Sequence, residues 1–316
     1  MKSRFIKSLS SLCVIFALAL TLSACKDNDS STPQDNGMET PSAELVFTYS
    51  NGTITGLTDL GKTLSEISIP SEINGEKITK VSANSFKNAT NITEVEIGSE
   101  VTEIEYAAFH NCDNLVNVNI PSNVKVIAKE AFSNCDKLET VILPDELTSI
   151  GSSAFYGTKY WNTSSNWDNK ALYIGKYLIS VNDEFNLDFN VKDGTLLIAD
   201  FAFSNGKVKT VTFANSVKYV GKEAFSNCAL LENVTTGSNV YEISDWAFAN
   251  CSKLNTVNLG ASLNSIGNSA YVNCAKLTSI NFSGTVSEWN LLSKGNNWNY
   301  NVLATKVICA DGEVGL

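Results

Sequence analysis

One pattern returns along the chain at a fixed interval of 23 residues, most clearly over 101–123, 124–146, 217–239 and 240–262. Its common form is V/L-x-x-I-x-x-x-A-F-x-N-C-x-x-L-x-x-V-x-I/L-P. A period of about 20–50 residues is typical of stacked supersecondary units, each of which buries its apolar side against its neighbours. We therefore expect each copy to form one coil of a solenoid, and the array to form one elongated domain rather than two globular ones.

The second half of each copy, L-x-x-V-x-I/L, alternates between apolar and polar residues as a half-buried strand does. Leu115, Val118 and Ile120 are expected to point inward in one such strand. The Ala-Phe-x-Asn-Cys segment is too short for an ordinary helix and predicts a turn. The expected fold is mostly β with short turns and 3-10 segments, a right-handed coil of about nine to ten rungs between two caps.

Alignment of the copies predicts three columns of side chains, formed by the aromatic, the Asn and the Cys positions. The aromatic position is predicted to form one buried spine, rather than a ligand-binding stripe, because its neighbours are apolar; it holds Phe86, Phe109, Phe132, Phe155, Phe203, Phe225, Phe248 and Tyr271. The Asn before each Cys is expected to hydrogen-bond turn backbone; these residues are Asn111, Asn134, Asn227, Asn250 and Asn273.

The cysteines at the next position are Cys112, Cys135, Cys228, Cys251 and Cys274. Buried free thiols are the favoured interpretation, although neighbouring coils lie close enough for disulfides, so the pairing of these residues and of Cys309 stays open. A metal site is disfavoured because the chain has 1 His and lacks a Cys-x-x-Cys pair. No cofactor is expected.

The N-terminus has the features of an export signal. Residues 1–24 combine a basic start with an apolar run, and Leu22-Ser23-Ala24-Cys25 resembles the lipobox of bacterial lipoproteins, which implies lipid attachment at Cys25. The polar segment 25–43 is expected to be a disordered tether. The net charge of −10 argues against nucleic acid and against any membrane contact other than the lipid anchor.

The remaining chain divides into a cap, an array and a second cap. Residues 44–77 are expected to form the N-terminal cap, with a hairpin at Asn51-Gly52 and a first strand near Ile67. Residues 78–281 form the repeat array. Residues 282–316 form the C-terminal cap, with a short helix over 287–293 that carries Trp289 and a closing strand near Val307.

The array is interrupted over 157–194, where one coil is expected to be replaced by an elaborated one. Residues 172–181 are predicted as a strand, and Leu187, Phe189 and Val191 as the missing rung of the interrupted array. Tyr160, Trp161 and Trp167 have two interpretations that the sequence does not decide between: binding anchors on a protruding loop, or aromatic residues that plug a distorted coil.

The repeat pattern, the Ile-Pro-Ser-Glu-Ile-Asn-Gly run at 69–75 and the Tyr-Ile-Gly-Lys-Tyr-Leu run at 173–178 resemble the BspA-like, Treponema-type leucine-rich repeat proteins of bacterial surfaces. The resemblance covers roughly 44–316 and implies a leucine-rich repeat solenoid, exported to the outer membrane or cell surface. In such a coil the residues between the inward strand positions face the concave surface. Here they include Ile142 and the candidate ligand-binding residues Glu94, Glu96, Asn117, Asn119, Thr140, Thr210, Thr212, Asn233, Thr235, Thr256, Asn258, Ser279 and Asn281.

Three classes of function follow, and they are weighed differently. The favoured one is a surface-anchored binding or adhesion protein that recognises a macromolecule, protein or glycan, without covalent chemistry. The alternative is a structural envelope scaffold. A carboxylate-dependent glycan hydrolase is disfavoured: Glu94 and Glu96 have a spacing near that of a catalytic pair, but the sequence has no nucleophile with a base and no phosphate loop.

Overall fold

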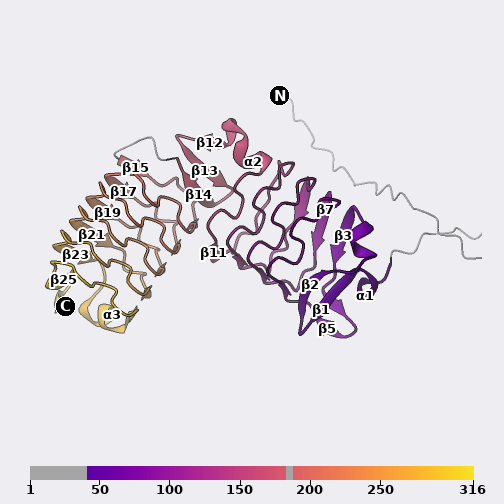
Figure 1. The fold of residues 1–316 in the computed structure, drawn as a ribbon. Helices are drawn as coiled ribbons and strands as arrows, with labels where there is room; N and C mark the ends of the chain where they lie inside the picture. Colours follow the sequence, from indigo (N-terminus) through magenta and orange to yellow (C-terminus); the bar gives the residue numbers. More distant parts are fainter. Residues whose placement is uncertain (1–40, 183–187) are drawn as a thin grey trace, which may run out of the picture. The chain divides into compact units, whose positions relative to one another are not determined.

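Each repeat forms one coil with two short strands, and the core lies between the two sheets that these strands build. The computed structural model describes residues 41–182 and 188–316, of which 43–316 form one compact unit (Figure 1). The solenoid has about 11 turns with little helix, somewhat more than the nine to ten expected, because strands of the caps complete turns of their own.

The short V-x-x-I strands form two back sheets, in which strands of successive coils pair in parallel. The N-terminal back sheet has the order β1 (Phe47–Ser50), β2 (Thr53–Leu57), β6 (Lys80–Val81), β8 (Glu103–Ile104), β10 (Val126–Ile127) and β11 (Ser149–Ile150). The C-terminal back sheet has the order β12 (Trp167–Asp168), β13 (Ala171–Ile174), β14 (Tyr177–Val181), β16 (Leu197–Ile198), β18 (Tyr219–Val220), β20 (Glu242–Ile243), β22 (Ser265–Ile266) and β24 (Ser293–Lys294).

The V-x-I strands form two front sheets, with the alternating burial that the sequence predicts. The N-terminal front sheet contains β3 (Glu66–Ile69), β7 (Glu94–Ile97) and β9 (Asn117–Asn119). The C-terminal front sheet contains β15 (Asp188–Asn190), β17 (Thr210–Thr212), β19 (Asn233–Thr235), β21 (Thr256–Leu259), β23 (Ser279–Phe282), β25 (Lys306–Cys309) and β26 (Gly312–Gly315).

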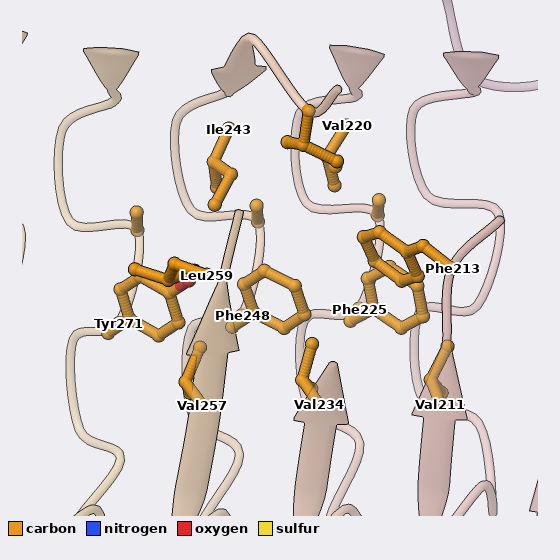
Figure 2. Packing of buried hydrophobic residues seen from close by; sticks show 14 of the residues in the cluster. Val211, Phe213, Val220, Phe225, Val234, Ile243, Phe248, Val257, Leu259 and Tyr271 are labelled. Atoms are coloured by element: carbon orange, nitrogen blue, oxygen red, sulfur yellow. The ribbon is translucent and has the colours of Figure 1, made fainter. Parts of the chain in front are cut away.

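The aromatic rings stack along the core between these sheets, with the strand valines on one side and the back-sheet residues on the other (Figure 2). Neighbouring rings are nearly parallel: the centroids of Phe109 and Phe132 are 5.1 Å apart with 2° between planes, and Phe248 and Tyr271 are 5.1 Å apart with 4°. The expectation of one continuous spine is wrong. The rings form two stacks, Phe86 to Phe155 and Phe203 to Tyr271, because the elaborated coil lies between them.

Asparagine side chains form a ladder across the turns. The Asn111 amide donates to the Asn88 amide oxygen (3.0 Å), and Asn250 donates to Asn227 in the same way (3.0 Å). The expectation that these amides bond turn backbone is therefore wrong. They bond each other, and Asn is suited to this position because its backbone is left-handed, with φ near 59° at Asn111 and Asn227.

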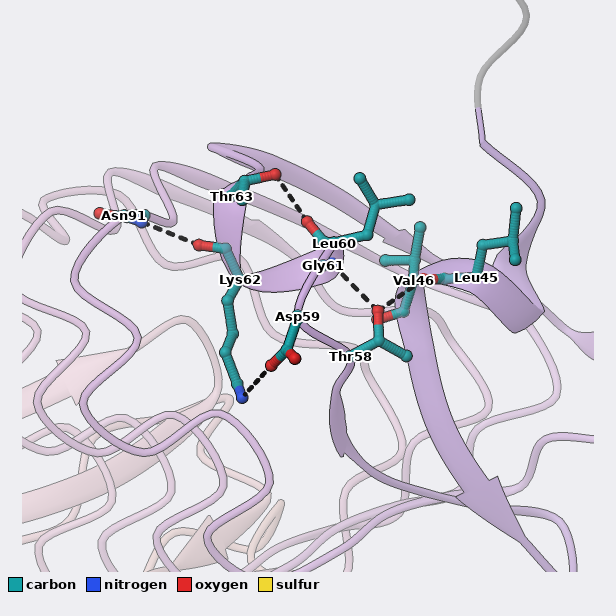
Figure 3. A network of polar contacts seen from close by, with 9 residues as sticks. All are labelled: Leu45, Val46, Thr58, Asp59, Leu60, Gly61, Lys62, Thr63 and Asn91. Atoms are coloured by element: carbon teal, nitrogen blue, oxygen red, sulfur yellow. Dashed lines mark hydrogen bonds and ion pairs between the residues drawn. The ribbon is translucent and has the colours of Figure 1, made fainter. Parts of the chain in front are cut away.

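The N-terminal cap has the predicted hairpin: Asn51 and Gly52 both have positive φ and join β1 to β2, and β2 then pairs in parallel with β6. Polar contacts fix its outer end, where the Thr58 hydroxyl donates to the carbonyl of Leu45 and Asn91 donates to the carbonyl of Lys62 at 2.8 Å (Figure 3). The other elements of this cap are α1 (Ala43–Val46), η1 (Gly61–Thr63), β4 (Glu72–Ile73) and β5 (Glu76–Lys77).

The elaborated coil repeats the architecture of the N-terminal cap. The segment 172–181, predicted as one strand, is a hairpin, because Gly175 adopts a φ of 56° and turns the chain between β13 and β14. Strand β14 pairs in parallel with the strand of the next coil, as β2 does in the N-terminal cap. The Phe189 ring meets Phe203, the first ring of its stack, edge-on at 84°, as Phe47 meets Phe86. Phe189 and Val191 are buried as predicted; Leu187 lies outside the described residues.

The hairpin joins the two halves of the core. Leu172 and Tyr177 belong to the N-terminal hydrophobic cluster, whereas Ala171 and Leu178 belong to the C-terminal one. The backbone N–H of Asp200 also donates to the carbonyl of Ile150, at 3.0 Å.

The C-terminal cap is close to the expectation. Helix α3 (Val286–Leu291) has a Thr285 capping box and buries Trp289, and β25 closes the front sheet. The antiparallel partner β26 was not anticipated.

Candidate functional site

The C-terminal front sheet carries two straight columns of polar side chains, which are neutral except for Asp188 at one end. The strands pair in parallel without register shifts, so equivalent residues of successive coils are aligned. The first column contains Asp188, Thr210, Asn233, Thr256 and Ser279, and the second contains Asn190, Thr212, Thr235, Asn258 and Asn281. The inward residues Val211, Val234 and Val257 are fully buried beneath them. The columns are called the strand ladder below.

The strand ladder is partly cross-linked by its own side chains. Asn281 donates to the Asn258 amide oxygen (2.8 Å), and Asn258 donates to the Thr235 hydroxyl (3.2 Å). These bonds orient the amides, and each hydroxyl or amide still has hydrogen-bonding capacity that faces solvent. The arrangement offers repeated weak donors and acceptors, with the backbone of the sheet already paired.

The N-terminal front sheet is shorter and acidic. Glu94 aligns with Glu66 and Asn117, and Glu96 aligns with Ser68 and Asn119, all exposed or half-exposed. Ser68 donates to the Glu96 carboxylate at 3.3 Å. A carboxylic acid that protonates a leaving group is normally buried in an apolar pocket, whereas Glu94 and Glu96 are both exposed.

The two front sheets are not continuous, and the break falls on the copy that matches the repeat best. Among the described residues, 139–143 belong to no sheet, although Val141 is buried as a strand residue would be. Helix α2 (Lys159–Asn162) occupies the place of the following strand: the Tyr160 N–H donates to the Leu138 carbonyl (2.9 Å), and Lys159 pairs with Glu139 (2.5 Å). Thr140 is therefore exposed outside any strand and does not extend the ladder.

The loop aromatics are packed into this break. Trp161 meets Trp167 edge-on at 5.2 Å, and both pack with Tyr160 against the N-terminal core. The Tyr160 hydroxyl donates to the carbonyl of Tyr173 (2.9 Å) and Trp167 Nε1 donates to the carbonyl of Trp161 (2.8 Å). Burial raises the pKa of the Tyr160 hydroxyl. These contacts describe residues that fill a distorted coil, with η2 (Ser164–Asn166) between them.

The six described cysteines are free and buried, as favoured from the sequence. The thiols of the repeat donate to the carbonyl of the Phe one coil earlier, such as Cys135 to Phe109 and Cys251 to Phe225, each at 3.1 Å. The neighbouring Cys112 thiol and burial raise the pKa of Cys135, so its thiol stays protonated and unreactive. Within residues 41–182 and 188–316, no group of three or more His, Cys, Asp or Glu is placed to hold a metal ion.

Sequence reasoning missed the exposed aromatic residues of the C-terminal array. Phe201, Tyr241 and Trp246 are exposed by 39%, 46% and 42%. The signal was present in the repeat alignment, since Trp246 occupies the position held by Ala107 and Glu130 in other copies.

Cys25, with its expected lipid, lies outside the described residues, as do the signal segment 1–24 and most of the tether. In the described part of the chain, no helix has the length and apolar character needed to cross a membrane.

Coils of a strand, a turn and a second strand, with inward apolar residues at fixed positions, define a leucine-rich repeat solenoid that is mostly β. The chain belongs to the family described as BspA type Leucine rich repeat region, which it matches in 6 copies over residues 61–186 and 174–293. Leucine-rich repeat solenoids of this kind are typically binding scaffolds rather than enzymes.

Solved structures of bacterial leucine-rich repeat proteins are similar to this chain. A T. pallidum leucine-rich repeat protein (TpLRR) is 23% identical, with 76% of this chain and 90% of that chain covered and a TM-score of 0.35. A Bacteroides ovatus leucine-rich repeat protein is 26% identical (84% and 69% covered, TM-score 0.36), and the pneumococcal vaccine antigen PcpA is 18% identical (78% and 68% covered, TM-score 0.41). No curated protein matches the chain.

Proposed function

We propose that the protein is a cell-surface binding protein that recognises an extended macromolecule, protein or glycan, along the strand ladder. The observation that supports this most is the straight alignment of Thr210, Asn233, Thr256 and Ser279 beside Thr212, Thr235, Asn258 and Asn281. Each contact to such a side chain is weak, so affinity would come from many of them in one direction. An extended partner with a regular spacing of polar groups meets that requirement best.

The ladder lacks the large anchors of tight protein interfaces. Apart from Asp188, its members are Thr, Asn and Ser, whereas Trp, Tyr and Arg dominate binding hot spots. We therefore expect modest affinity for one solenoid, strengthened when many copies on one surface meet a repetitive ligand.

We further propose that the chain is exported and attached to the bacterial outer membrane or cell surface through a lipid on Cys25. The Leu-Ser-Ala-Cys ending supports this, as does the polar segment 25–43 that would hold the solenoid away from the membrane. Cys25→Ser should abolish incorporation of radiolabelled palmitate and release the protein into the medium. Equal labelling of the variant and the wild type would refute the anchor.

The ladder is tested with the 26–316 protein on arrays of matrix proteins and glycans. The double substitution Thr235→Arg with Asn258→Arg places two bulky cations in the centre of the ladder and should weaken binding at least about 10-fold, since 1.4 kcal/mol corresponds to a factor of ten. Ser252→Arg, at an exposed turn residue away from the ladder, is the matched control. Equal binding by the ladder variant and the control would exclude the strand ladder as the binding surface.

Pull-down from intact cells separates the binding function from the alternative, a structural scaffold. A scaffold would retain components of the cell's own envelope, whereas an adhesion protein retains molecules from another cell or matrix. Retention of envelope components alone would refute adhesion.

A further inference from the structure

A second surface, on the opposite sheet from the strand ladder, has the chemistry of a small ligand site. A groove of about 420 Å³ crosses β20, β22 and β24 of the C-terminal back sheet. Its volume lies in the range of about 300–1,000 Å³ that is usual for ligand pockets. Coils lie about 4.8 Å apart, so the groove runs for about 10 Å along the solenoid axis.

Two glycines, Gly267 and Gly295, are among the residues that line the groove. A Cβ on Gly267 would lie 2.4 Å from the backbone nitrogen of Asp245, and one on Gly295 would lie 2.3 Å from that of Asn268. Close stacking of the coils therefore requires glycine at both positions.

The walls carry polar groups that the protein leaves partly unused. Asp245 accepts from Asn268 through Oδ1 alone (2.6 Å to the backbone N), and Glu242 accepts from Ser244 through Oε1 alone (3.3 Å). The Ser265 and Ser293 hydroxyls also line the groove, and the Lys222 ammonium group interacts electrostatically with the Asp200 carboxylate. The groove thus offers hydrogen-bond donors and acceptors, with the two carboxylates of Glu242 and Asp245 against the one ammonium group of Lys222.

Two exposed aromatic residues flank the lining segment 242–245. Tyr241, exposed by 46%, precedes it, and Trp246, exposed by 42%, follows it. The positive φ of Trp246 (59°) belongs to the repeat turn, since Ala107 (52°) and Glu130 (59°) have it at the same position. What distinguishes this copy is the large, exposed aromatic ring, and Trp and Tyr are the side chains most often used as binding anchors.

We propose that this groove, together with Tyr241 and Trp246 next to its lining segment 242–245, binds a short stretch of a neutral glycan. Sugar rings have an apolar C–H face that packs on Trp or Tyr, and hydroxyls that both donate to carboxylates and accept from Ser and Lys groups. An anionic polymer is disfavoured by Glu242 and Asp245, and an apolar protein surface by the polar side chains that line the groove. This site goes beyond the strand ladder and does not depend on it.

The test uses the 26–316 protein on an array of α-mannan, β-glucan and N-acetyllactosamine oligomers, with heparin as the anionic arm. Trp246→Ala should weaken binding of at least one neutral oligomer about 10-fold or more, and Ser265→Arg, which fills the centre of the groove, should abolish it. Tyr106→Ala is the matched control, since Tyr106 is also 42% exposed but lies in the N-terminal array. Circular dichroism melting of each variant checks that it is folded.

The outcomes separate this site from the proposed ladder. Loss of neutral glycan binding in the groove variants, with binding retained in the double ladder variant (Thr235→Arg with Asn258→Arg), supports the groove. Loss in the double ladder variant with full binding in Trp246→Ala and Ser265→Arg assigns the glycan to the ladder and overturns the groove. Failure of the wild type to bind any neutral oligomer, or preference for heparin, also overturns it.

Discussion

Truncation of Phe132 tests the two stacked cores directly. Its ring is fully buried between the rings of Phe109, at 5.1 Å, and Phe155, at 5.6 Å. Phe132→Ala removes both ring contacts and leaves a cavity that the rigid coils on either side cannot close, because their backbones are hydrogen-bonded to each other, as in Phe132 N–H to Ala154 O at 2.8 Å. Such a substitution costs about 3–5 kcal/mol.

The expected readout is a large fall in melting temperature. At about 2–4 °C per kcal/mol for a chain of this size, the midpoint should fall by about 10 °C. Phe201→Ala is the matched control, because Phe201 is 39% exposed and its truncation should change the free energy of unfolding by no more than about 0.5 kcal/mol. A loss below about 1 kcal/mol for Phe132→Ala would refute the stacked core.

Hydrogen exchange adds a spatial criterion. The hairpin β13–β14 separates the two ring stacks, and each coil of a solenoid is stabilised mainly by its neighbours. Amides of residues 101–157 should therefore lose protection in Phe132→Ala, while those of 203–282 keep most of theirs. Equal loss over both segments would show that the two halves unfold as one unit.

Three further substitutions or treatments have defined outcomes. Tyr271→Phe should raise the free energy of unfolding by about 1 kcal/mol, because the buried Tyr271 hydroxyl has no hydrogen-bond partner among the residues that the structure describes; a destabilised variant in urea melts would contradict this. The folded 26–316 protein should not react with Ellman's reagent, and the denatured protein should release the same number of thiols with and without prior reduction, because the cysteines are free and buried. Burial raises the pKa of Asp200 from 3.8 to about 6, so the folded state holds this proton more tightly than the unfolded state, and stability from this group is lost as the pH rises from about 4 to 6. Asp200→Asn should therefore gain stability over the wild type at pH 7 and lose that advantage at pH 4, and a gain that is equal at both pH values would assign it to another cause.

The repeat period predicts most of the architecture because every copy must satisfy the same contacts. The inward positions Leu115, Val118 and Ile120, the aromatic stack and the Asn51-Gly52 hairpin are determined by local pattern and by the need to bury one side of each coil. The C-terminal helix with Trp289 is likewise a local signal, a capping box beside an open coil end. These features depend on neighbours at most one coil away.

The interruption was harder to predict because its contacts reach in both directions. A Gly-Lys pair inside an apolar run is a weak turn signal, so the alternating pattern of 172–181 predicts one strand where the structure has the β13–β14 hairpin. Some of its side chains pack in the N-terminal hydrophobic cluster and others in the C-terminal one, and the hairpin therefore separates the two stacks of aromatic rings. Helix α2, in the next coil, takes the place of the strand that would pair with 139–143. The loss of the front strand at 139–143 therefore depends on the neighbouring coil and not on the local sequence.

The repeat pattern alone predicts the solenoid, its coil residues, its caps and the columns of Thr, Asn and Ser in the strand ladder, because a period of 23 residues repeats one set of local constraints. Contacts between coils set where the ladder ends, how far Trp161 and Trp167 are buried, and where the groove along Glu242 and Asp245 opens on the other sheet. These features escape the pattern because a side chain's exposure depends on what the adjacent coil places against it. In this chain the adjacent coil is not always another copy of the repeat.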